Sequence, residues 1–430
     1  MGQILSQPIT DKHSDQGEDE RLAYGLSSMQ GWRFSMEDAH ATVLDLKRGG
    51  EKSDVPTRIE DRVSFFGVYD GHGGDKVALY TGEHLHNIVA KQGPFARKDY
   101  GQALKDGFLG TDRAILEDSS FARDPSGCTA TTAIVTENKI YVANAGDSRT
   151  VLGVKGIAKP LSFDHKPNNE GERARICAAG GYVEVGRVNG NLALSRAIGD
   201  FDFKMTANLP PEEQIVTAYP DVMEHDINPD DEFVVLACDG IWDCMHSQQV
   251  VEFVRRGIAA KQELKDICEN IMDNCLAPES NFSGIGCDNM TVMIVGLLNG
   301  KTKEEWYDMI AKRVADGDGP VAPESFAEMK GNPFSGQSNQ MSSQSQEDEP
   351  RRYSIPIGAT TSFQQLLGHT AQVMNSNGTY VLETTDSGSL FSLGLRPREG
   401  DEDDEDSRQR IEEPITPEDE QEQPDQEQQR

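Results

Sequence analysis

The sequence predicts a folded domain of mixed strands and helices, followed by an acidic segment that lacks a core. Short apolar runs rich in aromatic and β-branched residues, at 65–69 and 232–237, have the length of buried strands and stop at Asp-Gly pairs. Residues 76–89 instead place apolar side chains at helical spacing. Beyond residue 317 the chain is rich in Ser, Gln, Pro and acids, a composition that cannot offset the entropy of ordering.

Composition excludes several classes of function. The 430-residue chain has a formal net charge of −32, so it lacks the basic surface that nucleic acids require and is repelled by anionic membranes. No apolar run approaches the ~20 residues of a membrane span. The seven cysteines form no CxxC pair and no zinc-ligand spacing, which indicates a reduced protein of the cytoplasm and nucleus.

The N-terminus is expected to be flexible over residues 1–21. Its first six residues, Met-Gly-Gln-Ile-Leu-Ser, fit the pattern for N-myristoylation at Gly2, and an unmodified terminus fits the same short motif equally well. A single acyl chain binds membranes only weakly, and no polybasic segment follows to reinforce it.

The predicted elements follow in order within residues 22–298, which we assign to one domain. Strands are expected at 23–27, 65–69, 129–136, 139–145, 150–154, 182–188, 192–194, 232–237 and 290–295, and helices at 76–89, 100–116, 247–257 and 263–276. Hairpin turns are predicted at Glu137-Asn138 and at the Asn-Gly-Asn sequence of residues 189–191. The polar segment 165–181 is either a mobile lid or an ordinary surface insertion.

An appended helix is predicted at residues 299–317. Thr302 and Glu305 form a capping box before an apolar stripe that includes Trp306, and Gly317 ends the stripe. We expect this stripe to pack on the main domain.

The C-terminal tail, residues 318–430, is predicted to be largely disordered. Its last thirty residues, 401–430, carry 14 acids against 3 bases. Residues 353–395 hold more apolar side chains, which suggests a short element or a docking motif.

Acidic residues recur where predicted strands end. Asp70, Asp147 and Asp239 each stand beside a glycine at such a position, and Asp288 precedes the strand at 290–295. Each alone fits an ordinary turn. Clustered carboxylates repel one another unless cations neutralise them, and ligand sets made only of oxygen favour Mg²⁺ or Mn²⁺. Their repetition therefore indicates a metal site of the kind used for phosphoryl displacement.

Two further residues suit that chemistry. The guanidinium of Arg33 can hold a phosphate, and the imidazole of His72, close to Asp70 in the chain, can protonate a leaving alkoxide. In isolation, Arg33 fits a surface ion pair and His72 a structural turn residue just as well.

Seven motifs, in order along the chain, resemble those of the metal-dependent protein phosphatases of type 2C. The motifs are Arg33 with Met36-Glu37-Asp38-Ala39-His40, Asp70-Gly71-His72-Gly73-Gly74, Gly127-Cys128-Thr129-Ala130, Asn144-Ala145-Gly146-Asp147-Ser148-Arg149, Leu194-Ser195-Arg196-Ala197-Ile198-Gly199-Asp200, Ala237-Cys238-Asp239-Gly240-Ile241-Trp242-Asp243 and Asp288-Asn289-Met290-Thr291. The resemblance covers roughly residues 22–298, and the acidic tail is most similar to that of the fungal members.

This resemblance implies an α+β fold, a four-layer α-β-β-α sandwich of two antiparallel sheets flanked by helices, with two Mg²⁺ or Mn²⁺ ions at one end. By motif match, the metal ligands are the bridging carboxylate of Asp70, the carbonyl of Gly71, and the carboxylates of Asp239 and Asp288. Glu37 and Asp38 are implied to hold metal-bound waters, and Asp147 with Asp243 to form a weaker third site.

The implied reaction is attack of metal-bound hydroxide on protein phosphoserine or phosphothreonine. Arg33 is implied to hold the phosphate and His72 to act as general acid, without a phosphoenzyme. Residues 165–187 correspond to the family's flap, which favours the lid interpretation. We expect a monomer that acts on kinases or their targets as a negative regulator of kinase signalling. A catalytically inactive phosphatase-like binding module and a hydrolase of small phosphoesters are the alternatives.

Overall fold

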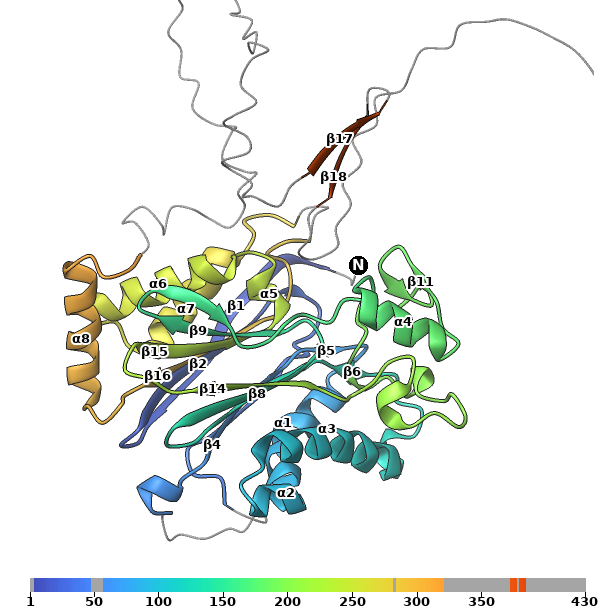
Figure 1. The fold of residues 1–430 in the computed structure, drawn as a ribbon, viewed down its shortest axis with the longest axis horizontal. Helices are drawn as coiled ribbons and strands as arrows, with labels where there is room; N and C mark the ends of the chain where they lie inside the picture. Colours follow the sequence, from blue (N-terminus) through green and yellow to red (C-terminus); the bar gives the residue numbers. More distant parts are fainter. Residues whose placement is uncertain (1–3, 48–56, 281–283, 321–371, 377–378, 384–430) are drawn as a thin grey trace, which may run out of the picture. The chain divides into compact units, whose positions relative to one another are not determined.

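Two antiparallel sheets face each other in the computed structural model, and helices cover the outer face of each sheet (Figure 1). The structure describes residues 4–47, 57–280, 284–320, 372–376 and 379–383. One sheet has six strands in the order β1-β2-β16-β15-β9-β10, and the other has five in the order β14-β8-β7-β4-β3. The arrangement confirms the predicted four-layer α-β-β-α sandwich.

The two large sheets contain most of the strands. The six-stranded sheet is built from β1 (Ile4–Glu18), β2 (Leu22–Arg33), β9 (Arg149–Val154), β10 (Ile157–Pro160), β15 (Asp231–Ala237) and β16 (Met290–Leu297). The five-stranded sheet is built from β3 (Ala39–Val43), β4 (Ser64–Tyr69), β7 (Ala130–Val135), β8 (Lys139–Ala145) and β14 (Asp221–Asp226). Two small sheets add β5 (Gly71–His72), β6 (Gly127–Cys128) and β13 (Ile198–Gly199), and the hairpin of β11 (Val183–Glu184) with β12 (Arg187–Val188).

The helices fall into two outer layers and a short insertion. They are α1 (Lys76–Lys91), α2 (Gly93–Ala96), α3 (Tyr100–Glu117), α4 (Glu170–Ala178), α5 (Asp239–Trp242), α6 (Ser247–Ala259), α7 (Leu264–Cys275) and α8 (Lys303–Ala315). Leu85 of α1 and Phe108 of α3 pack in one buried cluster on the five-stranded sheet, whereas α6, α7 and α8 contribute to another on the six-stranded sheet. Among these described helices, none has the length and apolar character needed to cross a bilayer.

Strand β4 shows how the sequence specifies the layers. Its side chains alternate between two buried environments, because successive residues of a strand point to opposite faces. Phe65 and Tyr69 join the cluster under the helices, while Phe66 and Val68 join the cluster between the sheets. All four are fully buried, which explains why the run is continuously apolar rather than alternating with polar residues.

The N-terminal segment differs from the expectation of a flexible stretch over residues 1–21. Residues 4–18 form the edge strand β1, which pairs with β2 in an irregular register. Ser14 and Lys12 hydrogen-bond to α7, with 2.6 Å from Ser14 Oγ to Glu269 Oε1. The strand is polar because it lies at the sheet edge, so hydrophobic periodicity carries no signal for it. Gly2 lies outside the described residues.

The predicted hairpin turn at 189–191 is present, but it is short. Val188 and Leu192 form a single bridge around Asn189 and Gly190, both of which have positive φ. The longer pairing, β11 with β12, turns instead at Val185-Gly186. Val185 has φ of +48° and is 94% exposed, a strained backbone conformation for a β-branched side chain.

The predicted C-terminal helix is α8, and its capping box is confirmed. Thr302 accepts from the backbone N–H of Glu305 at 3.2 Å, and Glu305 accepts from that of Thr302 at 3.0 Å. In the separate unit of residues 341–430, β17 (Gln372–Ser376) pairs with β18 (Thr379–Glu383). The rest of the predicted tail beyond residue 320 lies outside the described residues.

Candidate metal and phosphate site

The predicted site residues gather where strands of both large sheets end. Asp70 follows β4, Asp239 follows β15, and Asp288 precedes β16. Because Ala39 pairs with Tyr69 across β3 and β4, Asp38 comes beside Asp70. The site is therefore assembled from strands of two sheets that no local sequence pattern links.

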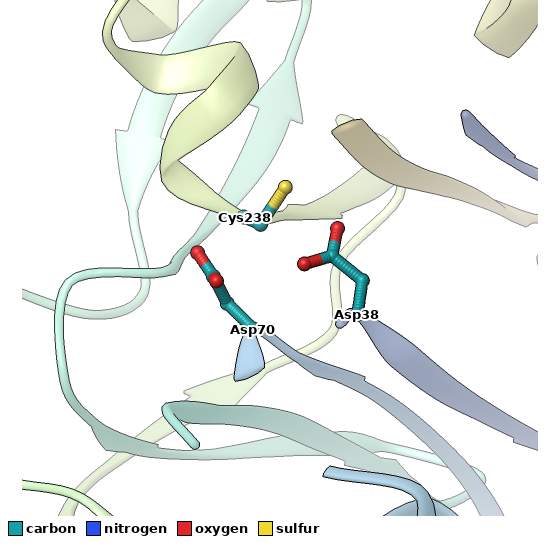
Figure 2. Close-up of side chains that lie close together, drawn as sticks. All are labelled: Asp38, Asp70 and Cys238. Carbon is teal, nitrogen blue, oxygen red and sulfur yellow. The ribbon is translucent and has the colours of Figure 1, made fainter. Parts of the chain in front are cut away.

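Asp38, Asp70 and Cys238 form the tightest group of potential ligands, and their side chains point toward one another (Figure 2). One ligand atom of each lies within 4.8 Å of the others. Asp38 Oδ2 accepts from Thr291 Oγ1 at 2.7 Å, but its buried Oδ1 has no hydrogen-bond partner. A buried carboxylate oxygen without a partner is costly, so this geometry fits a divalent cation.

Burial, reinforced by mutual repulsion, shifts the pKa values of the clustered acids upward. Burial, followed by the charge of Asp288 and despite the Thr291 hydrogen bond, raises the pKa of Asp38 to about 7. Burial and then the charge of Asp239 hold the pKa of Asp70 well above its usual value. Burial and then the charge of Asp147 do the same to the pKa of Asp239. These carboxylates need a positive charge among them to be ionised together.

Cys238 was not predicted as a site residue. Its sulfur accepts a hydrogen bond from the backbone N–H of Thr291 at 3.1 Å. Burial and the neighbouring carboxylates, led by Asp38, raise the pKa of its thiol well above the ordinary value. A protonated thiol is a poor ligand, so the carboxylates remain the donors that suit Mg²⁺ or Mn²⁺.

Gly71 is required by a close approach of backbone. A Cβ at this position would lie 2.2 Å from the carbonyl oxygen of Glu37, so any side chain would push away the segment that holds Glu37 and Asp38. This contact gives a reason for the glycine that is independent of its carbonyl acting as a metal ligand. Glu37 itself accepts from Ser35 Oγ at 2.7 Å.

Arg33 lies at the mouth of the site. Its guanidinium forms an ion pair with Asp288, and its side chain is 40% exposed. Burial raises the pKa of Asp288, while the charge of Arg33 opposes that shift. A guanidinium that is partly exposed while paired with the half-buried Asp288 can reach a phosphate without leaving its partner.

Asn289 positions the segment between Arg33 and Asp38, a role that is not predicted from the sequence. Its Nδ2 donates to the carbonyl oxygens of Gln30 at 2.8 Å and Ser35 at 3.0 Å. Its Oδ1 accepts from the backbone N–H of Glu37 at 2.9 Å. Its sequence signal is its place beside Asp288 in the motif Asp288-Asn289-Met290-Thr291.

Asp147 and Asp243, the residues of the predicted third site, lie on the Lys166 side of the cluster. Lys166 was not predicted, yet its Nζ bonds Asp147 directly. Burial lowers the pKa of Lys166, but the charge and hydrogen bond of Asp147 outweigh it and raise the pKa overall. Burial raises the pKa of Asp243 despite the charge of Lys166. Lys166 thus supplies a positive charge to this side of the cluster.

His72 is hydrogen-bonded to Asp200, with 2.7 Å between Nε2 and Oδ2. Burial lowers the pKa of His72, but the hydrogen bond and charge of Asp200 outweigh it and hold the pKa above its ordinary value. The imidazole is 27% exposed and feels the charges of Asp147 and Glu37, which places it beside the acidic cluster.

The predicted flap, residues 165–187, is fastened to the domain by charged groups. Glu172 of α4 pairs with Arg175 and Arg196, both at 2.8 Å, and is almost fully buried. Arg196 also pairs with Asp221 at 2.9 Å. Despite burial, the hydrogen bond and charge of Arg196 and the charge of Arg175 lower the pKa of Glu172 to about 2. These contacts fix the base of the insertion.

Comparison with known proteins gives consistent matches. Residues 22–283 match the family model described as "Protein phosphatase 2C". The chain is 69% identical over 316 residues to "Protein phosphatase 2C homolog 2" of Aspergillus fumigatus, covering 73% of each chain. It is 60% identical to "Protein phosphatase 2C homolog 2" of Schizosaccharomyces pombe, covering 77% of this chain and 88% of that one.

Among solved structures, one of a phosphatase from a pathogenic strain of Toxoplasma gondii superimposes with a TM-score of 0.56. It is 26% identical and covers 68% of this chain and 97% of its own. The residues that match the family model, 22–283, lie within the layered domain.

Proposed function

The chain belongs to the protein phosphatase 2C family and is a metal-dependent protein phosphatase, and we propose that it hydrolyses phosphoserine and phosphothreonine with two Mg²⁺ or Mn²⁺ ions. The observation that carries the proposal is the close group formed by the buried Asp38 and the half-buried Asp70. One buried Asp38 oxygen lacks a partner, and both carboxyl pKa values are raised by burial and repulsion.

The residues that would hold the cations are those implied by the motifs. Asp70, Asp239, Asp288 and the carbonyl of Gly71 would bind two ions, Glu37 and Asp38 would hold their waters, and Asp147 with Asp243 would bind a weaker third. When bound, the cations neutralise these carboxylates and lower the pKa of a water for attack on phosphorus.

Two side chains of the protein then act on the substrate. Arg33 binds the phosphate oxygens, and its ion pair with Asp288 holds the guanidinium at the site while half of it stays exposed. His72 gives its proton to the serine or threonine oxygen as that oxygen leaves. Burial lowers the pKa of His72, but the hydrogen bond and charge of Asp200 raise it overall, which favours the protonated form that a general acid needs.

Folded phosphoproteins, kinases or their targets, are the substrates that we propose, with a role as a negative regulator of kinase signalling in cytoplasm and nucleus. All seven cysteines are free thiols, as expected for a protein in a reducing compartment such as the cytoplasm or nucleus. We also propose that the protein is a monomer. Any membrane contact would be weak and made by a myristoyl group on Gly2.

The test is turnover of a phosphoserine peptide with Mn²⁺, with Mg²⁺ and with a chelator, for the wild type and Asp239→Asn. We expect the chelator to abolish turnover and Asp239→Asn to lower it at least ~100-fold, since a ligand of the reacting centre is lost. Asp308→Asn, on the exposed face of α8, is the matched control and should behave as wild type. Equal turnover in chelator would contradict the metal mechanism, and binding without turnover in any metal would favour the binding module.

A further inference from the structure

We propose that Asp200 is the positioning residue of His72 and fixes which ring nitrogen faces the substrate. The inference rests on the proposed role of His72 as general acid and gives a role to Asp200, which ends one of the seven motifs but has no site role assigned from the sequence. Its basis is the pair formed by the two side chains, whose Nε2 and Oδ2 atoms are 2.7 Å apart.

Three short strands bring the pair together. His72 of β5 lies opposite Gly127 of β6, and Gly127 in turn lies opposite Gly199 of β13. Asp200 directly follows Gly199, so His72 and Asp200 flank the same central residue. Their side chains meet across it although they are separated by 128 positions in the sequence.

Gly127 leaves the space in which the pair forms. A Cβ at this position would lie 2.2 Å from Asp200 Oδ2 and 2.7 Å from His72 Nε2. Gly127 is not among the glycines with positive φ, so its backbone conformation is one that other residues adopt. Glycine is therefore required here by the contact between His72 and Asp200, rather than by the backbone conformation of residue 127.

The segment that carries Asp200 is fastened to α3. Asp112 of α3 accepts from the backbone N–H of Gly199 and from Lys204 Nζ, both at 2.8 Å. Lys204 also donates to the carbonyl of Ala197 at 2.8 Å. These bonds hold both ends of the turn, so the carboxylate of Asp200 is fixed before a substrate arrives.

Asp200 has a reason to bond His72. Its side chain is 5% exposed, and His72 is the partner that the structure gives to its carboxylate. A buried carboxylate is stable only when hydrogen-bonded or paired. Its backbone adopts φ +52° and ψ +43°, a left-handed conformation that Asp and Asn both tolerate.

The pair assigns separate tasks to the two ring nitrogens. Nε2–H donates to Asp200. In the proposed mechanism, Nδ1–H is then the proton donor to the leaving oxygen. As the P–O bond of the substrate breaks, the proton of Nδ1 passes to the serine or threonine oxygen and water supplies the new oxygen on phosphorus. The ring is left neutral, with its remaining proton on Nε2 and bonded to Asp200.

The experiment compares Asp200→Asn, His72→Gln and the double variant on a phosphoserine peptide and on 4-nitrophenyl phosphate. Asp202→Asn, two residues away and exposed, is the matched control. We expect Asp200→Asn to lower kcat on the peptide ~100-fold with little change in KM, and to affect the aryl phosphate only a few-fold because its leaving group needs no proton. The double variant should be no slower than His72→Gln.

A second measurement does not depend on activity. Long-range ¹H–¹⁵N spectra of the full-length wild type, with His72→Gln for assignment, should show a His72 Nε2–H proton shifted downfield by its hydrogen bond. Absence of that signal in the wild type would overturn the inference, even if Asp200→Asn failed to fold. The inference would also be overturned if Asp200→Asn turned over the peptide at the wild-type rate. Equal losses of activity on the peptide and on 4-nitrophenyl phosphate in Asp200→Asn would overturn it as well. If His72→Gln lost both activities equally, the proposed role of His72 as general acid would be wrong. The NMR spectrum would still show whether His72 and Asp200 are hydrogen-bonded.

Discussion

Asp38 keeps one buried carboxylate oxygen without a partner while the other accepts from Thr291, and its pKa of about 7 follows from burial and the charge of Asp288. The unfolded value is near 3.8, so the folded state holds the proton more tightly than the unfolded state does. Ionisation of Asp38 above pH 7 therefore destabilises the metal-free protein. This destabilisation disappears as pH falls through 7 toward 4.

We therefore expect the chelator-treated protein to melt at a temperature several degrees higher at pH 6 than at pH 8. Asp38→Asn removes one ionisable group while retaining its size, so the difference should be smaller in the variant, with the remainder due to the neighbouring carboxyl groups whose pKa values are also raised. Thermal unfolding followed by circular dichroism measures both, and saturating Mn²⁺ should also flatten the wild-type dependence. If the melting temperature changed equally with pH in the wild type and in Asp38→Asn, ionisation of Asp38 would not be the cause of the pH dependence.

At the scale of elements, the sequence predicts those whose burial is regular. Helices α1, α3, α6 and α7 appear within three residues of their expected bounds, since each has one apolar face against a sheet. Strand β4 was predicted because both its faces are buried. Strand β1 was missed because it is polar along an exposed edge, and the flap hairpin was displaced because its turn uses Val185, a residue that turn preferences disfavour.

Helix α8 is an integral part of the domain rather than an addition to it. Trp306 is fully buried, and its indole Nε1 donates to the carbonyl of Glu232 at 3.1 Å. A Cβ on Gly296 would lie 3.0 Å from the indole, so the ring packs directly on the backbone of β16. The helix thus covers part of the six-stranded sheet.

Trp306→Ala should lower the free energy of unfolding by ~3–5 kcal/mol, because it opens a large cavity and leaves the Glu232 carbonyl unpaired. Urea unfolding measures the loss. Glu304→Ala, on the exposed side of the same helix, is the control and should change stability by less than about 0.5 kcal/mol. A loss for Trp306→Ala as small as that of the control would show that α8 docks only loosely.

At the scale of the molecule, the candidate metal ligands have a local sequence signal, whereas the residues that hold them in place do not. Asp70 and Asp239 stand where apolar runs stop and Asp288 stands just before one begins, which is a local signal. Asp200 and Asn289 act through partners far away in sequence, since Asp200 meets His72 and Asn289 holds Glu37. Such contacts depend on how the sheets assemble, and a single sequence gives no signal for the pairing of distant segments.

The boundary between the domain and the tail lies farther along the chain than residue 317. Arg255, fully buried in α6, donates to the carbonyl of Asp318 and to that of Pro320 at 3.2 Å. It also contacts buried Glu232, at 3.3 Å between Nη2 and Oε1. Residues 318–320 therefore satisfy a buried guanidinium, and removing them leaves that charge with fewer acceptors.

Two truncations separate the tail from the domain. A chain ending at Ala322 keeps these acceptors, so it should unfold at the same urea concentration as the full chain and retain its turnover of 4-nitrophenyl phosphate. A chain ending at Gly317 loses both carbonyls and should be less stable by roughly 1–3 kcal/mol, the cost of leaving buried donors unpaired. Arg255→Met should abolish the difference between the two truncations, because it removes the donors that need the acceptors. Equal stability of the two truncations in the wild-type background would place the boundary at residue 317, and lost turnover in the longer one would give the tail a part in catalysis.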